Sequence, residues 1–162
     1  MTKVFIDQGH NPANPNAGAE GNGLREQDLV YEIGVRLASL LNADPEFEAR
    51  LSRNSPTEIL GETTAQSLRA RTDAANSWGA DIFISLHANA STITSASGSE
   101  GLVYKIPSAA YTLSEDILTE LSLATGLQDR GTTARPGLYV LRKTTMPAVL
   151  GELGFITNAG DA

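Results

Sequence analysis

Short apolar runs recur along the chain and are separated by longer stretches with helical periodicity. Residues 3–7 form a run rich in β-branched and aromatic side chains, and residues 81–86 form a second run that is apolar on both faces. Runs of this kind are typical of buried strands. The same reasoning predicts further strands over 47–52, 101–106, 138–141 and 148–152.

Three segments between these strands carry apolar residues at the spacing of an amphipathic helix. The first covers 26–42, where leucine, isoleucine and valine recur on one face. The second begins at Thr63 or Thr64, whose hydroxyl can cap it, and ends at Gly79. The third covers 108–125 and is also followed by a glycine. Each helix therefore has one apolar face that has to be buried against another element.

The alternation of strands and helices predicts an α/β fold. We expect a three-layer αβα sandwich in which helices cover both faces of a twisted, mostly parallel central sheet of about six strands. The length of 162 residues suits one domain, so a single domain over 1–162 is expected. In sheets of this type, ligands bind beyond the carboxyl ends of the strands.

Composition narrows the chemistry that this fold can carry. The chain has no cysteine and only two histidines. The lack of cysteine excludes thiol nucleophiles, disulfides and zinc bound by sulfur. A metal site would therefore have to be built from histidine and carboxylate side chains.

Charge and hydropathy argue against two classes of partner. A net charge of −7 and a pI of about 4.7 would repel phosphate groups, so we expect no nucleic-acid partner. We expect no membrane span, because no apolar stretch approaches the roughly 20 residues that cross a bilayer. The apolar run at Val4 follows Met1 too closely for a secretory signal to fit in this chain, which leaves its export route unspecified.

Both histidines directly follow an apolar run. His10 comes after 3–7 and His87 comes after 81–86. If the two strands are parallel neighbours, their carboxyl ends bring both imidazoles to one edge of the sheet, where they could bind zinc. The alternative is that each is an ordinary loop histidine hydrogen-bonded to backbone. That interpretation is weakened because both histidines lie at strand ends and none lies elsewhere.

A third ligand is expected from the acidic residues near the first helix. Glu26 lies at the helix start, so its carboxylate can fold back over the same edge. Without a metal, an acidic group in a first turn would still stabilise the helix by about 0.3–1 kcal/mol. Glu20 and Asp28 compete with Glu26 for the ligand role on position alone.

Glu152 is an acidic residue in the otherwise apolar segment 148–155. Burying a carboxylate there raises its pKa or costs several kcal/mol, so it should either pair with an arginine or take part in proton transfer. Beside a metal, proton transfer is favoured, because a carboxylate can take a proton from water and pass it to a leaving amine. The structural alternative is a salt bridge to Arg71 or Arg142.

Taken together, these motifs closely resemble the zinc-dependent N-acetylmuramoyl-L-alanine amidases of the amidase type 3 family. The resemblance rests on segments 7–10 (DQGH), 85–90 (SLHANA) and 147–158 (PAVLGELGFITN), with Glu26 opening a helix between the first two. It runs nearly from end to end of the chain. The loop 11–19 departs from the family pattern, because asparagine and proline replace its usual glycines and acidic residue.

The resemblance implies a role for each candidate residue. Zinc would be bound by His10, Glu26 and His87, and Glu152 would be the catalytic carboxylate. The substrate would be bacterial peptidoglycan, cut at the amide that joins N-acetylmuramic acid to the L-alanine of the stem peptide. Such an autolysin acts on the cell wall, outside the cytoplasm.

Two other functions stay open on the residues alone. A zinc carboxypeptidase, or a hydrolase of another amide polymer, could use the same three ligands and a glutamate. The chain could also be a wall-binding module without turnover, although an idle site has no physical reason to keep a buried carboxylate.

The resemblance also bears on the extent of the domain and on its partners. Family members usually continue into a final helix, so we expect that helix to be missing from a catalytic domain that covers 1–162. Because the chain is acidic, adsorption to anionic wall polymers should be weak. A separate wall-binding domain or a regulator protein is therefore expected.

Overall fold

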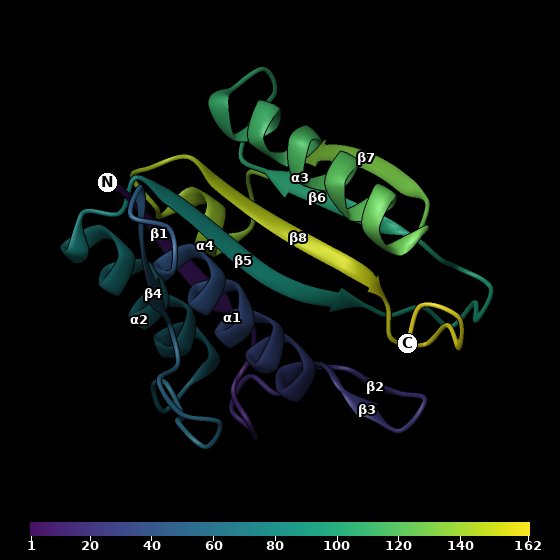
Figure 1. Ribbon diagram of the computed structural model, residues 1–162. Coiled ribbons are helices and arrows are strands. Elements are labelled where there is room, and N and C mark those ends of the chain that lie inside the picture. The colour runs from purple at the N-terminus through teal and green to yellow at the C-terminus, as the bar shows by residue number, and fades with distance from the viewer.

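Six strands form one twisted sheet through the centre of the computed structural model, which describes residues 1–162 (Figure 1). Their order across the sheet is β4-β1-β5-β8-β6-β7. The strands are β1 (Thr2–Gln8), β4 (Phe47–Leu51), β5 (Ile82–Asn89), β6 (Ser99–Val103), β7 (Asp129–Ala134) and β8 (Ala148–Phe155). Neighbouring strands are parallel except for β6 and β8. The predicted mostly parallel α/β sheet is confirmed.

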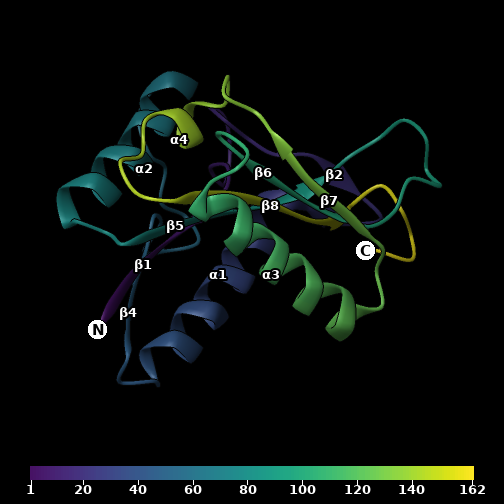
Figure 2. The same cartoon turned by 90° about the horizontal axis from the view of Figure 1, so that it is seen from above.

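Helices cover both faces of this sheet, as the predicted sandwich requires. The helices are α1 (Glu26–Asn42), α2 (Thr64–Trp78), α3 (Ala109–Thr125) and α4 (Tyr139–Arg142). Figure 2 shows α1 and α3 on one face and α2 and α4 on the other. None of them is long and apolar enough to cross a membrane.

Side chains alternate between the two faces along each strand, which produces a separate apolar layer on each side. Toward α2 and α4, Phe5 stacks on Phe83 with ring centroids 5.8 Å apart, and Leu150 joins the same cluster. Toward α1, Ile6 and Val30 are fully buried in a second cluster. The central strands are therefore held from both sides, which makes their carboxyl ends a rigid base for a site.

Helix boundaries agree with the sequence predictions. The hydroxyl of Thr63, rather than that of Thr64, caps α2 by accepting a hydrogen bond from the backbone N–H of Gln66 at 3.1 Å. Gly79 ends α2 in the left-handed conformation, with φ 68°.

Two predictions at the carboxyl-terminal half were wrong. Residues 138–141 were predicted to form a strand but fold mainly as the short helix α4, which packs Val140 and Leu141 into the cluster beneath α2. The predicted sheet also lacked β7, whose sequence DRGTTA is polar and mostly exposed because it lies at the edge of the sheet. Residues 138–141 are too few to show a hydrophobic periodicity that distinguishes a strand from a helix. The edge strand β7 is polar, so it has no apolar face by which the sequence could reveal it.

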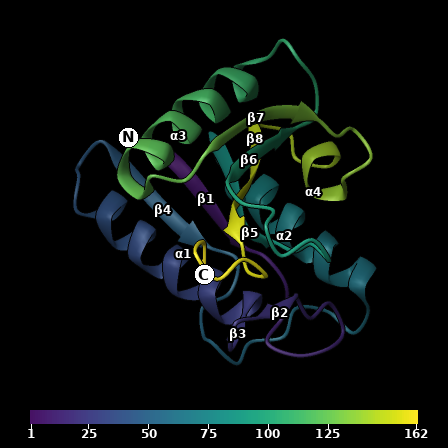
Figure 3. The same cartoon turned by 90° about the vertical axis from the view of Figure 1, so that its right-hand side faces the viewer.

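A two-stranded hairpin projects from the loop before α1. It consists of β2 (Glu20–Gly21) and β3 (Leu24–Arg25). Asn22 donates a hydrogen bond to the carbonyl of Ile156 at 2.8 Å, which ties the hairpin to the segment after β8. Figure 3 looks onto the carboxyl ends of β5 and β8, with the hairpin and the C-terminus at this end of the molecule.

Packing of α3 on β6 leaves no room for a side chain at Gly101. A Cβ atom there would lie 1.9 Å from the hydroxyl of Ser114, which is fully buried. We expect Gly101→Ala to lower the free energy of unfolding by about 1–3 kcal/mol, because overpacking forces the helix away from the strand. Thermal unfolding followed by circular dichroism measures this, with Gly137→Ala as control because a Cβ there meets nothing within 4 Å. Equal melting temperatures for Gly101→Ala and Gly137→Ala would contradict the packing described.

Candidate metal centre

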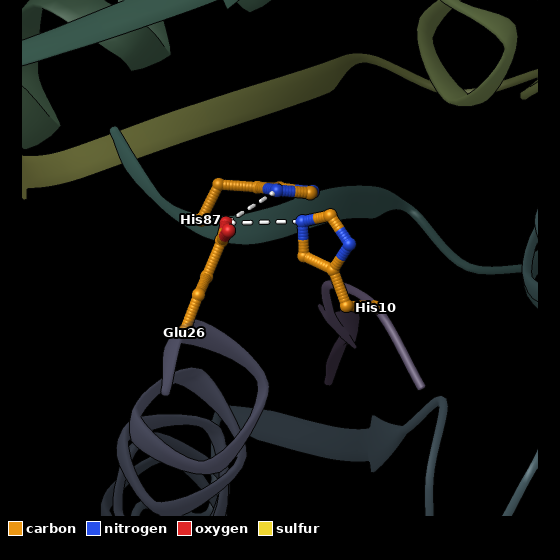
Figure 4. Close-up of side chains that lie close together, drawn as sticks. All are labelled: His10, Glu26 and His87. Carbon is orange, nitrogen blue, oxygen red and sulfur yellow. Dashed lines mark hydrogen bonds and ion pairs between the residues drawn. The ribbon is translucent and has the colours of Figure 1, made fainter. Parts of the chain in front are cut away.

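Three side chains meet at the carboxyl ends of β1 and β5 (Figure 4). The Oε1 atom of Glu26 lies 3.1 Å from Nε2 of His10 and 3.1 Å from Nδ1 of His87. One candidate ligand atom from each residue lies within 4.8 Å of those of the other two. The predicted convergence of the two histidines with an acid from the first helix is therefore present.

Parallel pairing of β1 with β5 explains why the histidines meet. Gln8 pairs with Leu86, so the residues that follow each of them lie at the same edge of the sheet. His87 lies within β5, two residues before its end, and not after the strand as predicted. The strand continues because Asn89 still pairs with Phe155 of β8, past an irregularity that follows His87.

Two glycines allow the backbone to approach the three side chains closely. A Cβ atom on Gly9 would lie 2.5 Å from Cε1 of His87 and 2.6 Å from its Nε2. A Cβ atom on Gly18 would lie 2.8 Å from Oε2 of Glu26. The loop that joins β1 to the hairpin therefore wraps directly around His10, His87 and Glu26.

Glu26 is the first residue of α1 and is only 4% exposed. Its Oε1 also accepts a hydrogen bond from the N–H of Ala88 at 3.0 Å, and its Oε2 accepts one from the N–H of Ala19 at 2.9 Å. Burial alone would raise the pKa of Glu26, but the hydrogen bonds and charges of His10 and His87 hold it well below its ordinary value. Glu26 is therefore an ionised carboxylate fixed in place by backbone and side-chain donors.

The competing carboxylates lie elsewhere. Glu20 is on the exposed hairpin, 3.7 Å from Nε of Arg25, and Asp28 lies 3.2 Å from Nη1 of the same arginine. The structure therefore brings Glu26 to the two histidines and leaves Glu20 and Asp28 in surface ion pairs.

The two imidazoles differ in their surroundings. The His10 and His87 rings pack edge to face with centroids 4.8 Å apart. Burial would lower the pKa of His87, but its hydrogen bond to Glu26 and the charge of Glu152 raise it overall. Nδ1 of His10 is buried and has no hydrogen-bond partner. Two imidazole nitrogens and one anionic carboxylate oxygen around one point are the donors that catalytic zinc sites use.

Glu152 lies beside this cluster, at the level of His87 in the pairing of β5 with β8. Its Oε2 is buried without a hydrogen-bond partner, and its carboxylate forms no ion pair. The alternative salt bridges are absent, because Arg71 pairs with Asp7 at 2.8 Å and Arg142 lies over the ring of Tyr139. Burial raises the pKa of Glu152 above its ordinary value; the charge of His87 opposes this rise without cancelling it, and the charges of Glu26 and Glu100 add to it.

Sequence reasoning missed the support behind the cluster. Asp7, Ser85 and Arg71 form a buried network in which Asp7 accepts hydrogen bonds from both of the others at 2.8 Å. A signal was available, since Asp7 and Ser85 are polar residues next to the apolar parts of their strands and are partners in the pairing of β1 with β5.

Comparison with known proteins matches the chain to a known family. The profile of the Amidase_3 family, described as N-acetylmuramoyl-L-alanine amidase, matches residues 4–162. N-acetylmuramoyl-L-alanine amidase CwlM of Bacillus licheniformis is 40% identical over 164 residues, which cover 100% of this chain and 60% of that protein. The sporulation-specific N-acetylmuramoyl-L-alanine amidase of Bacillus subtilis (strain 168) is 38% identical over 164 residues, which cover 100% of this chain and 59% of that protein.

Solved structures agree with these sequence matches. The catalytic domain of CwlV, an N-acetylmuramoyl-L-alanine amidase from Bacillus (Paenibacillus) polymyxa var. colistinus, superposes with a TM-score of 0.84 and 32% identity. That alignment covers 98% of this chain and 83% of the CwlV domain. The chain thus spans about three fifths of the length of the two Bacillus relatives, at 60% and 59%, and most of the CwlV catalytic domain.

Proposed function

The chain belongs to the Amidase_3 family of N-acetylmuramoyl-L-alanine amidases, and from that premise we propose that it is a zinc-dependent hydrolase of bacterial peptidoglycan. The bond cut is the amide between N-acetylmuramic acid and the L-alanine of the stem peptide. The observation that carries the proposal is the meeting of His10, Glu26 and His87 beside the unpaired carboxylate of Glu152.

His10, Glu26 and His87 are the residues that would hold the zinc ion. When bound, zinc supplies a Lewis acid that polarises the amide carbonyl and lowers the pKa of water toward about 7. Glu26 suits this role because it is ionised and already held by the backbone N–H groups of Ala88 and Ala19. The low pKa of its carboxyl keeps this donor anionic near neutral pH, where the enzyme would work.

Glu152 is the group that moves the proton. It accepts a proton from the attacking water and returns it to the nitrogen of the leaving L-alanine, so the amide is replaced by a carboxylic acid and a free amine. Its raised pKa makes the carboxylate a stronger base, which favours the first of these transfers, from the attacking water. The partnerless Oε2 supports this role, because a purely structural carboxylate in an apolar strand would be paired.

The products released from purified peptidoglycan test the proposal. Mass spectrometry should find free stem peptides with an L-alanine amino terminus together with sugar chains that have lost their peptides. Trimmed stem peptides still attached to sugar would contradict the amidase and favour a carboxypeptidase. An intact wall that retains bound protein would contradict any hydrolase and favour a wall-binding module without turnover.

The contact between Gly9 and His87 gives a prediction for metal affinity. We expect Gly9→Ala to weaken zinc binding by about tenfold or more, because the new methyl group displaces the His87 ring, and groups that orient ligands typically contribute 10–100-fold. Competition with a chromophoric chelator measures the affinity, with Gly137→Ala again as control. Unchanged zinc affinity in Gly9→Ala would contradict this prediction, because it would show that zinc binding does not depend on the position of the His87 ring next to Gly9.

Attachment to the wall is proposed to come from outside this chain. The net charge of −7 opposes adsorption to anionic wall polymers. A separate wall-binding domain or a partner protein would then bring the site to its substrate. Sedimentation with purified wall should leave most of the isolated chain in the supernatant at physiological salt, and strong retention would contradict this part of the proposal.

A further inference from the structure

A buried guanidinium lies directly behind the proposed metal centre. Arg71 belongs to α2, on the face of the sheet opposite α1 (Figure 2), and is 1% exposed. Its Nη1 donates to Oδ1 of Asp7 at 2.8 Å and to the carbonyl of Gln8 at 2.5 Å. Its Nη2 donates to the carbonyl of His10 at 2.6 Å and to Oδ1 of Asn11 at 3.3 Å. One side chain therefore holds the end of β1 and the first residues of the loop that follows.

The backbone at His10 has an unusual conformation that needs such support. Its φ is 66°, in the left-handed region, which is unfavourable for a residue with a side chain. One of the two carbonyls that Arg71 binds belongs to this residue, so the guanidinium holds the turn that directs the imidazole toward Glu26.

The imidazole of His10 lacks the support that metal-binding histidines usually have. Such a histidine generally donates its second ring N–H to a carboxylate or a carbonyl, which sets the orientation of the ring. Nδ1 of His10 is buried and has no partner, while Nε2 faces Glu26. The orientation of the ring therefore has to come from the backbone that carries it.

The same network also reaches the strand that carries the second histidine. Oδ2 of Asp7 accepts a hydrogen bond from the hydroxyl of Ser85 at 2.8 Å, and Ser85 precedes His87 by two residues in β5. Arg71 is thus connected through Asp7 to β5, which carries His87, as well as directly to the turn that carries His10.

We infer that Arg71 is a positioning residue for the metal centre, which sets zinc affinity by holding the backbone of His10. The inference rests on the proposed function. Arg71 itself does not contact the cluster of His10, Glu26 and His87 side chains through any hydrogen bond. The planar guanidinium of Arg71 donates to four oxygen atoms, one on Asp7 and three on residues of the turn. The single ammonium group of lysine cannot reach all four at once.

The variant that tests this is Arg71→Lys, which keeps a positive charge beside Asp7 but loses the planar guanidinium group. We expect it to fold and to bind zinc about 10–100-fold more weakly than the wild type in competition with a chelator. The visible absorption spectrum of bound Co²⁺ should change as well, because the His10 donor is displaced. A purely structural ion pair would alter the melting temperature and leave both readouts as in the wild type.

The control is Leu118→Ala, which removes a buried side chain from α3 on the other face of the sheet. It should lower the melting temperature and leave zinc affinity and the Co²⁺ spectrum unchanged at temperatures where the protein is folded. If Arg71→Lys behaves like Leu118→Ala, the positioning role is overturned. If the wild type itself binds no zinc, the proposed function is overturned and the inference falls with it.

A second variant tests the same inference in case Arg71→Lys does not fold. The double variant Asp7→Asn, Arg71→Gln removes both charges of this buried pair together with the guanidinium, so neither member is left as a buried ion without its partner. It should show the same loss of zinc affinity as Arg71→Lys. If neither variant folds, Arg71 is a determinant of folding alone and the inference is overturned.

Discussion

Glu152→Gln is expected to bind zinc like the wild type and to lose most of its hydrolytic activity. Glutamine has the size of glutamate but cannot accept the proton of the attacking water, and removal of a general acid–base group typically costs 10²–10⁴-fold in rate, or about 3–5 kcal/mol. Glu152 is not among the three candidate ligands His10, Glu26 and His87, so metal content should not fall. Release of stem peptides from purified muramyl peptides, with metal analysis of the same sample, measures both effects.

The matched control for this experiment is Glu120→Gln, which makes the same chemical change on the exposed side of α3. It should retain full activity and full zinc content. Wild-type activity in Glu152→Gln would remove Glu152 from the mechanism, even if the metal assignment stood.

His87→Ala is expected to lose stoichiometric zinc and, with it, all measurable turnover. Only two histidines are present in the chain, so removing His87 leaves His10 and Glu26, and a two-donor site binds zinc far more weakly than a three-donor site. Metal analysis after dialysis should give about one zinc per chain for the wild type and close to none for the variant.

Thermal unfolding gives an independent readout of the same change. A ligand that binds only the folded state raises stability by about 2.7 kcal/mol at 100 times its dissociation constant. Zinc should therefore raise the melting temperature of the wild type and not that of His87→Ala. Tyr104→Ala, which removes an exposed ring, should respond like the wild type. Equal zinc content in His87→Ala and the wild type would overturn the ligand assignment.

Much of the fold could be predicted because its central elements are strongly patterned. The segment 81–86 is apolar on both faces, and β5 is indeed covered by α1 on one side and by the cluster around Phe83 on the other. Capping chemistry placed the ends of α2, since Thr63 and Gly79 act through local hydrogen bonds and backbone conformation. The edge strand β7 and the short helix α4 were missed because neither has a hydrophobic periodicity that identifies its secondary structure.

The convergence of the site could be predicted from topology, whereas the choice of Glu26 among the nearby acids came only from the family resemblance. Parallel strands bring the residues after 3–7 and 81–86 to one edge, so His10 and His87 had to lie close together once β1 and β5 were neighbours. The choice of Glu26 over Glu20 depends on how the hairpin folds and on which carboxylate Arg25 attracts, and neither is readable from spacing.

Apart from the paired polar residues Asp7 and Ser85, the support of the site was also beyond sequence reasoning. The role of Arg71 depends on three carbonyl or amide oxygens that a single turn directs toward α2. The close approach at Gly9 depends on the side-chain orientation of a residue in another strand. Contacts of this kind come from tertiary structure, because the sequence pattern at each position is compatible with several partners.

The central claim is that His10, Glu26 and His87 together bind one zinc ion next to Glu152. Crystals of the protein grown with zinc, with diffraction recorded on both sides of the zinc absorption edge, test it most directly. The account predicts one anomalous peak among these three side chains that vanishes below the edge. A map with no peak there, or with zinc bound only by other residues while the two imidazoles point apart, would contradict it.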